Sequence, residues 1–270
     1  MEIRGAVAVV TGASAGIGRA TAVALAREGA TVVVAARRED RLHELVSEIE
    51  RRGGRAVAVR CDVADRKQIE TLARQVLAGQ GRCDILVNNA GIPGGGPFAE
   101  LSWEQIERIV AVNYIGVLAC TKAFLPSMLE ARKGHVVNVA SLAGRFAVPG
   151  SSVYSSTKHA VVSFSEALHY EVSSRGLLVT AVNPGLVATE GFPHRDALEK
   201  GRRVMKPERI AEVIVDVVKR GKAPEVSIPR ILAAMQIFRV LTPPLYRFGL
   251  ARVVRTTIRP TRAGEADASP

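Results

Sequence analysis

The chain has 270 residues, of which 47% are hydrophobic and 23% charged, a composition that excludes a disordered protein. It is long enough to bury the core of one large domain, and 37 Lys and Arg against 26 Asp and Glu give a formal net charge of +11. Three cysteines without CxxC spacing and five histidines without metal-ligand spacing predict reduced thiols in a cytoplasmic protein and no metal site.

The first predicted element is a short buried strand at Val7–Val10, so close to Met1 that we expect no secretory signal. A glycine-rich turn and then a periodic helix to about Glu28 follow this strand. This arrangement presents backbone N–H groups and a positive helix end to a phosphate. The glycine spacing is G-x-x-x-G-x-G, and the alternative is a merely flexible loop. The dinucleotide-binding residues predicted here are Gly12, Ser14, Gly16, Ile17 and Gly18.

The second predicted strand, Thr31–Ala36, ends at Arg37 and Arg38. A dinucleotide-binding fold places an acid near this point when it binds the ribose 2′-hydroxyl of NAD, whereas a basic residue suits a 2′-phosphate. We therefore expect NADP(H), with NAD(H) as the less favoured cofactor. The alternative is that the two arginines only cover the start of the next helix.

Further apolar runs alternate with amphipathic helices along the chain. This alternation predicts an α/β fold: a single Rossmann-type doubly wound domain with a parallel seven-stranded sheet and helices on both faces. We expect this domain at residues 1–228, a basic amphipathic extension at 229–262 and a disordered tail at 263–270. The expected strands lie near residues 6–10, 31–36, 55–60, 84–87, 134–140, 177–182 and 225–228.

Tyr154 and Lys158 are four residues apart, which places both side chains on one face of a helix. A fixed ammonium favours the anionic form of a nearby phenol, so we expect the pKa of Tyr154 to fall far enough for proton exchange near neutral pH. Taken alone, the pair is weak evidence, because such spacing is more often only a solvated pair on a helix surface.

With its neighbouring motifs, the pair makes the chain similar to the classical short-chain dehydrogenase/reductase family over roughly residues 3 to 228. The ordered motifs are Thr11–Gly18, Cys61-Asp62-Val63, Asn88-Asn89-Ala90-Gly91, Asn113, Ser141, Tyr154 with Lys158, Pro184-Gly185 and Thr189. The resemblance implies an enzyme in which hydride moves between nicotinamide and a carbonyl or secondary alcohol.

The resemblance also implies a role for each motif. Tyr154 would exchange a proton with the substrate oxygen, Ser141 would hydrogen-bond that oxygen, and Lys158 would bind the nicotinamide ribose. Asn113 would hold a water through its backbone carbonyl. Without the resemblance, Asn113 and Ser141 are also explained as structural polar groups and Asp62 as a turn residue. The remaining implied cofactor-binding residues are Asp62, Val63, Asn89, Ala90, Gly91, Pro184, Gly185, Val187 and Thr189.

Oligomer formation is likewise implied by the resemblance, because the helix from about Ser152 to Ser174 is the usual subunit contact of the family. We therefore expect a homodimer or homotetramer. The loop from Glu190 to Pro207 corresponds to the usual substrate lid, and Phe146, Val148 and Phe192 indicate an apolar wall.

The charge is concentrated near the C-terminus, where residues 219–262 hold ten basic residues and one acid, Glu225. An apolar stripe accompanies it at helical spacing until Pro243-Pro244. Such a basic amphipathic segment suits an anionic membrane surface, and packing on the enzyme explains it equally well. We expect no nucleic-acid partner, because no recognised module is present. The stripe consists of Ile231, Leu232, Met235, Phe238 and Leu241.

Three functions follow from these patterns. The first is an NADP(H)-dependent reductase or dehydrogenase acting on a hydrophobic ketone or alcohol. The second is a non-catalytic NADP-binding scaffold that attaches through its basic tail. The third is a 3-oxoacyl thioester reductase, whose acidic carrier protein would explain the basic surface. The complete set of Asn113, Ser141, Tyr154 and Lys158 favours an enzyme over the scaffold.

Overall fold

A computed structural model describes the chain except residues 95, 191–203, 230, 246–247 and 249–270, and except the side chains of 232–235 and 238. It contains a parallel sheet of seven strands in the order β3-β2-β1-β4-β5-β6-β7. The expected fold is therefore confirmed, with strand ends shifted by at most two residues. The strands are β1 (Val7–Thr11), β2 (Thr31–Ala36), β3 (Arg55–Arg60), β4 (Ile85–Asn88), β5 (Gly134–Val139), β6 (Leu177–Pro184) and β7 (Glu225–Ile228).

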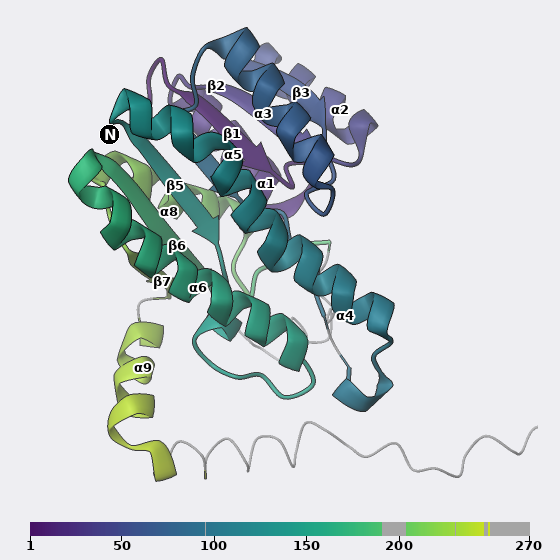
Figure 1. Ribbon diagram of the computed structural model, residues 1–270, viewed down its shortest axis with the longest axis vertical. Coiled ribbons are helices and arrows are strands. Elements are labelled where there is room, and N and C mark those ends of the chain that lie inside the picture. Colours follow the sequence, from purple (N-terminus) through teal and green to yellow (C-terminus); the bar gives the residue numbers. More distant parts are fainter. Residues whose placement is uncertain (95, 191–203, 230, 246–247, 249–270) are drawn as a thin grey trace, which may run out of the picture. The chain divides into compact units, whose positions relative to one another are not determined.

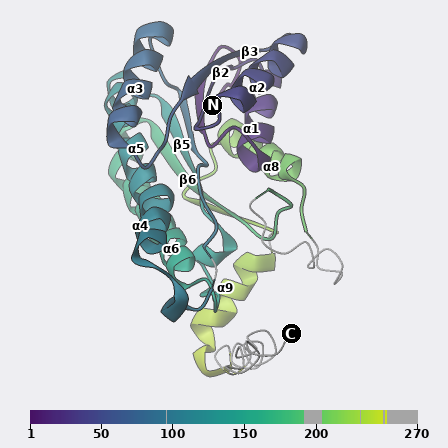
Figure 2. The same cartoon turned by 90° about the vertical axis from the view of Figure 1, so that its right-hand side faces the viewer.

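Helices cover both faces of this sheet (Figures 1 and 2). One layer holds α1 (Gly16–Arg27), α2 (Glu39–Arg51) and α8 (Pro207–Arg220). The opposite layer holds α3 (Arg66–Gln80), α4 (Trp103–Val110), α5 (Gly116–Ala131) and α6 (Ser152–Val172). Because β1 and β2 are then buried on both faces, they read as nearly continuous Val- and Ala-rich runs, whereas the edge strands β3 and β7 are only partly buried. Short 3₁₀ turns lie at η1 (Phe98–Glu100), η3 (Leu142–Gly144) and η4 (Ser173–Arg175), and η2 (Ala111–Ile115) is a π-helical turn.

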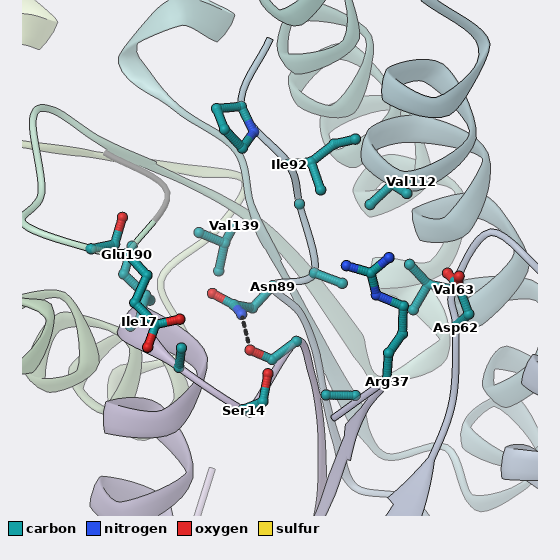
Figure 3. Close-up of a pocket in the computed structure, with 18 of the residues that line it drawn as sticks. Ser14, Ile17, Arg37, Asp62, Val63, Asn89, Ile92, Val112, Val139 and Glu190 are labelled. Carbon is teal, nitrogen blue, oxygen red and sulfur yellow. Dashed lines mark hydrogen bonds between the residues drawn. The ribbon is translucent and has the colours of Figure 1, made fainter. Parts of the chain in front are cut away.

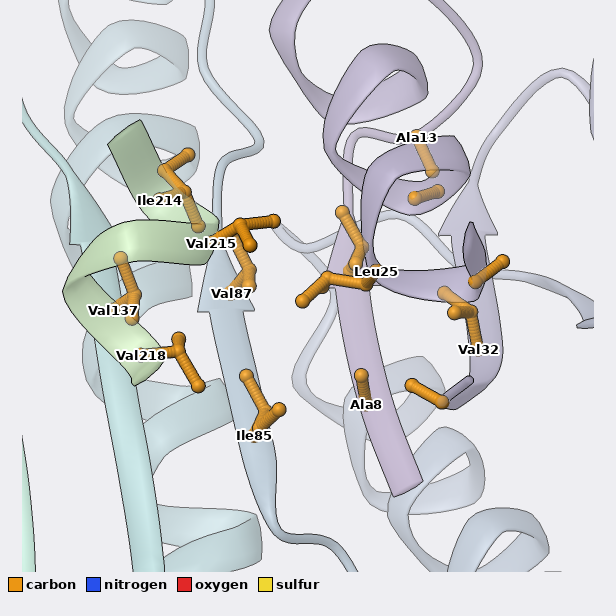
Figure 4. Close-up of a cluster of buried hydrophobic side chains, with 14 of the residues drawn as sticks. Ala8, Ala13, Leu25, Val32, Ile85, Val87, Val137, Ile214, Val215 and Val218 are labelled. Atoms are coloured by element: carbon orange, nitrogen blue, oxygen red, sulfur yellow. The ribbon is translucent and has the colours of Figure 1, made fainter. Parts of the chain in front are cut away.

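The core is formed where α1 and α8 meet the sheet. Leu25 of α1 and Ile214 and Val218 of α8 are fully buried against β1, β2 and β4 (Figure 4). The ends of α8 follow from its sequence, since Pro207 occupies the first turn and Gly221 adopts the left-handed conformation that closes it. This packing fixes the carboxyl ends of the central strands, where the candidate site lies.

The run Trp103–Ala131 is long and apolar enough to span a membrane by composition. Cys120, Phe124 and Met128 of this run are buried inside the domain, against the sheet face opposite α1. Burial in the core thus explains why this segment is apolar.

The chain divides into two compact units, Met1–Arg230 and Ile231–Pro270. In the second unit, α9 (Ile231–Leu241) confirms the predicted helix, and Pro243–Leu245 are helical again. Ile231, Ile237 and Val240 are exposed. The arginines from Arg247 onward, the predicted tail 263–270 and the side chains of Leu232, Met235 and Phe238 lie outside the described residues. The limits proposed for the extension stay a prediction.

Candidate active site

A cleft of ≈ 360 Å³ opens at the carboxyl ends of β1, β2 and β4 (Figure 3). It lies where the strand order reverses between β1 and β4, the usual ligand position in an open parallel sheet. The predicted residues that line it are Gly12, Ser14, Gly16, Ile17, Arg37, Arg38, Asp62, Val63, Asn89, Ala90, Gly91, Tyr154, Lys158 and Thr189. Gly18, Asn113, Ser141, Pro184, Gly185 and Val187 lie outside this lining.

The glycine-rich turn packs directly on the segment after β4. A Cβ on Gly12 would lie 2.7 Å from the Cα of Ala90, and one on Gly18 would overlap the Gly12 carbonyl oxygen. The Asn89 side chain donates to the carbonyls of Thr11 at 3.0 Å and Gly12 at 3.2 Å. The glycines therefore allow a backbone approach that leaves room for a ligand in front of α1.

Arg38 spans the mouth of the cleft. Its Nη2 donates to Ser14 Oγ at 3.1 Å and its Nη1 pairs with Glu190 at 2.9 Å. Arg37 lies in the part of the cleft that also holds Asp62 and Val63 (Figure 3). Two arginines at the end of β2 therefore line the cleft, and Arg38 contacts the Ser14 hydroxyl, so this part of the cleft is rich in donors suited to a phosphate.

Asp62 is held by Arg108, a residue that the sequence did not single out. Arg108 Nη2 of α4 donates to Asp62 Oδ2 at 2.8 Å, and the Ala64 N–H donates to Oδ1 at 3.0 Å. Burial opposes ionisation of Asp62, but the Ala64 and Arg108 hydrogen bonds outweigh it and lower its pKa. No motif spacing marks Arg108, because the contact joins positions 46 residues apart.

Tyr154 and Lys158 line the cleft, and Ser141 lies next to Tyr154, outside that lining. Lys158 is buried, donates from Nζ to the Val139 carbonyl at 2.9 Å, and lies 5.8 Å from the centroid of the Tyr154 ring. Ser141 follows β5 and hydrogen-bonds Tyr154. The Tyr154 phenol and the Ser141 hydroxyl are therefore neighbours that could both donate a hydrogen bond to a substrate oxygen, with the Lys158 ammonium held close to the tyrosine ring.

Asn113 lies in the π-helical turn η2, a local irregularity often found at functional sites. Its side chain accepts from the Ile92 N–H at 2.8 Å and donates to the Ile92 carbonyl at 2.9 Å. A Cβ on Gly91 would lie 3.4 Å from Asn113 Oδ1 and 3.5 Å from Lys158 Nζ. Asn113 therefore fixes the loop after β4 beside the lysine.

The segment after β6 approaches the glycine-rich turn. The Gly185 N–H donates to the Ile228 carbonyl at 2.8 Å, and Val187 forms a bridge with Met205. A Cβ on Gly16 would lie 3.0 Å from the Thr189 methyl group. Thr189 thus lies over the start of α1, while Pro184 ends β6. Residues 191–203 of the predicted lid, including Phe192, lie outside the described residues.

The pKa of Tyr154 departs from the sequence expectation. Burial of the phenol raises it, and the hydrogen bond with Ser141 offsets the rise only in part. The expected fall required the Lys158 charge to dominate, but Lys158 is itself buried and its Nζ is directed to the Val139 carbonyl. The direction predicted from the Tyr–Lys spacing is therefore wrong for this structure.

Burial also lowers the pKa of Lys158 from 10.5 to about 8. Between these values the folded protein binds fewer protons than the unfolded chain, so the Lys158 contribution to the free energy of unfolding rises with pH. We expect the stability of the wild type relative to Lys158→Met to increase by about 1 kcal/mol from pH 7 to pH 9. Urea unfolding of both proteins at each pH measures this, and an unchanged difference would contradict it.

Among the described residues, no three His, Cys, Asp or Glu side chains form a group that could hold a metal ion. Cys61, Cys83 and Cys120 are buried free thiols. The absence of a metal requirement stays a prediction, since the structure describes only part of the chain.

The fold, the glycine-rich turn and the Tyr–Lys–Ser cluster define a dinucleotide-binding oxidoreductase. The family model for short chain dehydrogenases matches residues 6–199. The chain belongs to the short-chain dehydrogenase/reductase family.

Curated relatives span several lengths. Glycine betaine reductase ATRR of Emericella nidulans is 41% identical over 226 residues, 81% of this chain and 18% of the relative. "Probable oxidoreductase EphD" of Mycobacterium tuberculosis is 36% identical over 264 residues, 91% of this chain and 45% of the relative. The chain thus spans less than half of these two proteins. A 3-oxoacyl-[acyl-carrier-protein] reductase of Synechocystis is 40% identical over 185 residues, 68% of this chain and 75% of the relative.

Two solved structures are similar throughout the domain. A variant of actinorhodin polyketide ketoreductase with NADPH has a TM-score of 0.78 and 34% identity, covering 83% of this chain and 95% of that one. The 3-ketoacyl-(acyl-carrier-protein) reductase of Brucella melitensis complexed with NADH has a TM-score of 0.77 and 30% identity, covering 84% and 97%. A nicotinamide cofactor is thus common to the family, and both phosphorylation states occur among these neighbours.

Proposed function

We propose that the protein is an NADP(H)-dependent reductase of a carbonyl group on a hydrophobic substrate. The observation that carries this proposal is the arrangement of one cleft. Arg37 and Arg38 line the same cleft as Tyr154 and Lys158. A dinucleotide laid along this cleft would place its 2′-phosphate beside the arginines and its reactive ring beside the phenol.

The residues present fit such a cofactor. The close contacts at Gly12 and Gly18 leave the backbone N–H groups at the start of α1 facing the cleft, which suits a pyrophosphate. Asp62, held by Arg108, suits the adenine, and Thr189 beside Gly16 suits the carboxamide. When bound, NADPH supplies the hydride, and the protein supplies geometry, a proton and electrostatics.

In the proposed reaction Tyr154 donates its phenolic proton to the substrate oxygen, and Ser141 hydrogen-bonds the same oxygen. Lys158, held near Tyr154, stabilises the phenolate that this transfer leaves. Asn113 holds the loop after β4 against Lys158 and so keeps the ammonium in place.

An apolar substrate is supported by the loops beside Tyr154. A Cβ on Gly94 would lie 3.4 Å from the Tyr154 Cβ, and the Gly96 N–H donates to the Gly150 carbonyl at 2.8 Å. Phe98, which follows Gly96 in the chain, and Val148, which precedes Gly150, are both exposed. Phe146, expected in the same wall, is buried, and its place in that wall stays a prediction.

A 3-oxoacyl thioester is the substrate class that these proteins favour, because the Synechocystis relative and the Brucella structure are described as 3-oxoacyl- or 3-ketoacyl-carrier-protein reductases and the other structure as a polyketide ketoreductase. The basic surface agrees with an acidic carrier. A panel of hydrophobic ketones, 3-oxoacyl thioesters and sugars, assayed by NADPH oxidation with NADH as control, tests this. Turnover of sugars alone would overturn the hydrophobic class, and tight NADPH binding without turnover would favour the scaffold.

The cofactor preference has its own test. Arg37→Ala and Arg38→Ala should each weaken NADPH binding by about tenfold or more, since each removes a charge-assisted hydrogen bond to the 2′-phosphate, and NADH binding should change little. Fluorescence titration of both nucleotides measures the effect. Arg41→Ala, an exposed arginine of α2, is the matched control. Equal losses for NADPH and NADH would refute the 2′-phosphate assignment.

Three further properties stay predictions. We propose a homodimer or homotetramer through α6, a cytoplasmic location, and contact of the basic extension with an anionic membrane surface. Tyr170, exposed on α6, supports a protein contact on that helix. The exposed apolar side chains of α9 support an association of the extension.

A further inference from the structure

Arg145 directly follows η3, the 3₁₀ turn that begins after Ser141. Its Nε donates to Glu225 Oε1 of β7 at 2.8 Å, and its Nη2 pairs with Oε2 of the same carboxylate. The two side chains are only 28% and 22% exposed. A two-point contact of this kind fixes orientation as well as distance, unlike a single exposed ion pair.

Glu225 also holds the neighbouring strand. Asn183 of β6, fully buried, donates from Nδ2 to Glu225 Oε1 at 2.6 Å. The register pairs Ala181 with Glu225 and Asn183 with Ser227, which places these side chains on one face of the sheet. The Glu225 carboxylate therefore connects two parts of the protein. It binds Arg145, which follows Ser141 and η3, and it binds β6, the strand that leads to Gly185 and Thr189.

The turn η3 has little freedom on its other side. A Cβ on Gly144 would lie 2.7 Å from the Lys158 carbonyl oxygen, so η3 packs on α6 at the lysine itself. The Ala143 N–H donates to Ser141 Oγ at 3.1 Å, which couples the serine side chain to this turn. The turn is thus held between α6 and the edge strands, and the Arg145 contact is its attachment to those strands.

We propose that Arg145 and Glu225 are positioning residues that hold the Ser141 side chain in place beside Tyr154. Neither residue touches the cleft, so their effect on the reaction passes through η3. The inference rests on the proposed function, because Ser141 must act on the substrate oxygen. It also gives a role to Glu225, the one acidic residue in the segment from Lys219 to Arg262, which holds ten basic residues.

A merely structural role would be to fasten the edge strand β7. Such a role would lower the thermal stability of an Arg145 variant, but the folded fraction would keep its turnover number. A positioning role would instead lower kcat at an unchanged affinity for NADPH, and the loss would depend on the presence of Ser141.

The test is a double-mutant cycle of Arg145→Met and Ser141→Ala, assayed with NADPH and the carbonyl compound that the wild type reduces fastest. We expect Arg145→Met to lower kcat by about tenfold with the Kd for NADPH within about twofold, because small misplacements of a catalytic group cost this much or more. In the Ser141→Ala background the same substitution should have almost no further effect. Arg145→Lys, which restores one contact, should recover part of the loss.

Lys219→Met is the matched control, because Lys219 pairs with Glu28 at 2.7 Å between α8 and α1, away from η3. It should leave kcat unchanged. The proposal would be overturned if Arg145→Met lowered kcat no more than Lys219→Met does. It would also be overturned if Arg145→Met lowered kcat by the same factor in the Ser141→Ala background as in the wild type. If Arg145→Met does not fold, Glu225→Gln replaces it in the same cycle, since the amide keeps one acceptor for Asn183.

A second readout needs no turnover. The Ala143 amide should exchange with solvent at least about tenfold faster in Arg145→Met than in the wild type, because its bond to Ser141 Oγ is released. Unchanged protection would overturn the proposal. If no carbonyl compound is reduced by the wild type, the proposed function fails, and the exchange measurement still decides whether Arg145 positions Ser141.

Discussion

Replacing Tyr154 by Phe is expected to lower kcat by about three orders of magnitude, because proton transfer by a positioned side chain contributes 10²–10⁴-fold. The substitution removes one hydroxyl and keeps the ring, whose neighbours include the Gly94 backbone and Lys158. NADPH should still bind with nearly its original Kd, since the arginines and the glycine-rich turn are unchanged. Steady-state turnover and fluorescence titration measure the two quantities.

Tyr170→Phe is the control, because Tyr170 lies on the same helix but is 66% exposed. It should keep full turnover. Near-normal turnover in Tyr154→Phe would show that another group donates the proton. A parallel loss of NADPH binding would instead show that the phenol serves the cofactor and not the substrate.

The sequence predicted the fold because buried parallel strands and glycine-rich turns leave local patterns. The Val- and Ala-rich runs at 31–36 and 55–60 match β2 and β3 at both ends, and the expected strand at 225–228 matches β7. The central strands β1 and β4 are shifted by one residue, since their terminal Thr11 and Asn88 are polar but buried. Polarity alone could not place these residues inside the sheet.

The candidate site was predictable only where its residues belong to one local segment. Tyr154 and Lys158 share a helix, and the glycines share a turn, so spacing predicts their proximity. Arg108 with Asp62 and Arg145 with Glu225 join positions 46 and 80 residues apart, and no spacing predicts such pairs. The residues that position the expected site were therefore the ones missed.

The direction of the Tyr154 pKa shift was missed for a related reason. Spacing shows that an ammonium is near a phenol, but it does not show how deeply either is buried. Lys158 is 4% exposed, and the burial that lowers its own pKa also raises that of the phenol. When a charge pair is predicted from sequence, the burial of both groups must therefore be known before the direction of a pKa shift can be assigned.

Gly18→Ala is expected to lower the free energy of unfolding by about 3 kcal/mol, because the new methyl group would overlap the Gly12 carbonyl and the Asn89 side chain. Backbone atoms cannot rotate away as a flexible side chain can. The turn must therefore shift, and a shift that breaks one charge-assisted hydrogen bond to a phosphate weakens NADPH binding by about tenfold or more. Urea unfolding and nucleotide titration measure both effects.

Gly79→Ala is the matched control, since a Cβ at this helical position of α3 meets nothing within 4 Å. It should raise stability by up to about 1 kcal/mol, because Ala is the better helix former, and leave NADPH binding unchanged. The contrast separates close packing at the turn from the general cost of adding a methyl group. If Gly18→Ala keeps the stability and NADPH affinity of the wild type, the turn is looser than its contacts indicate, and the backbone cradle for the pyrophosphate is not set by this packing.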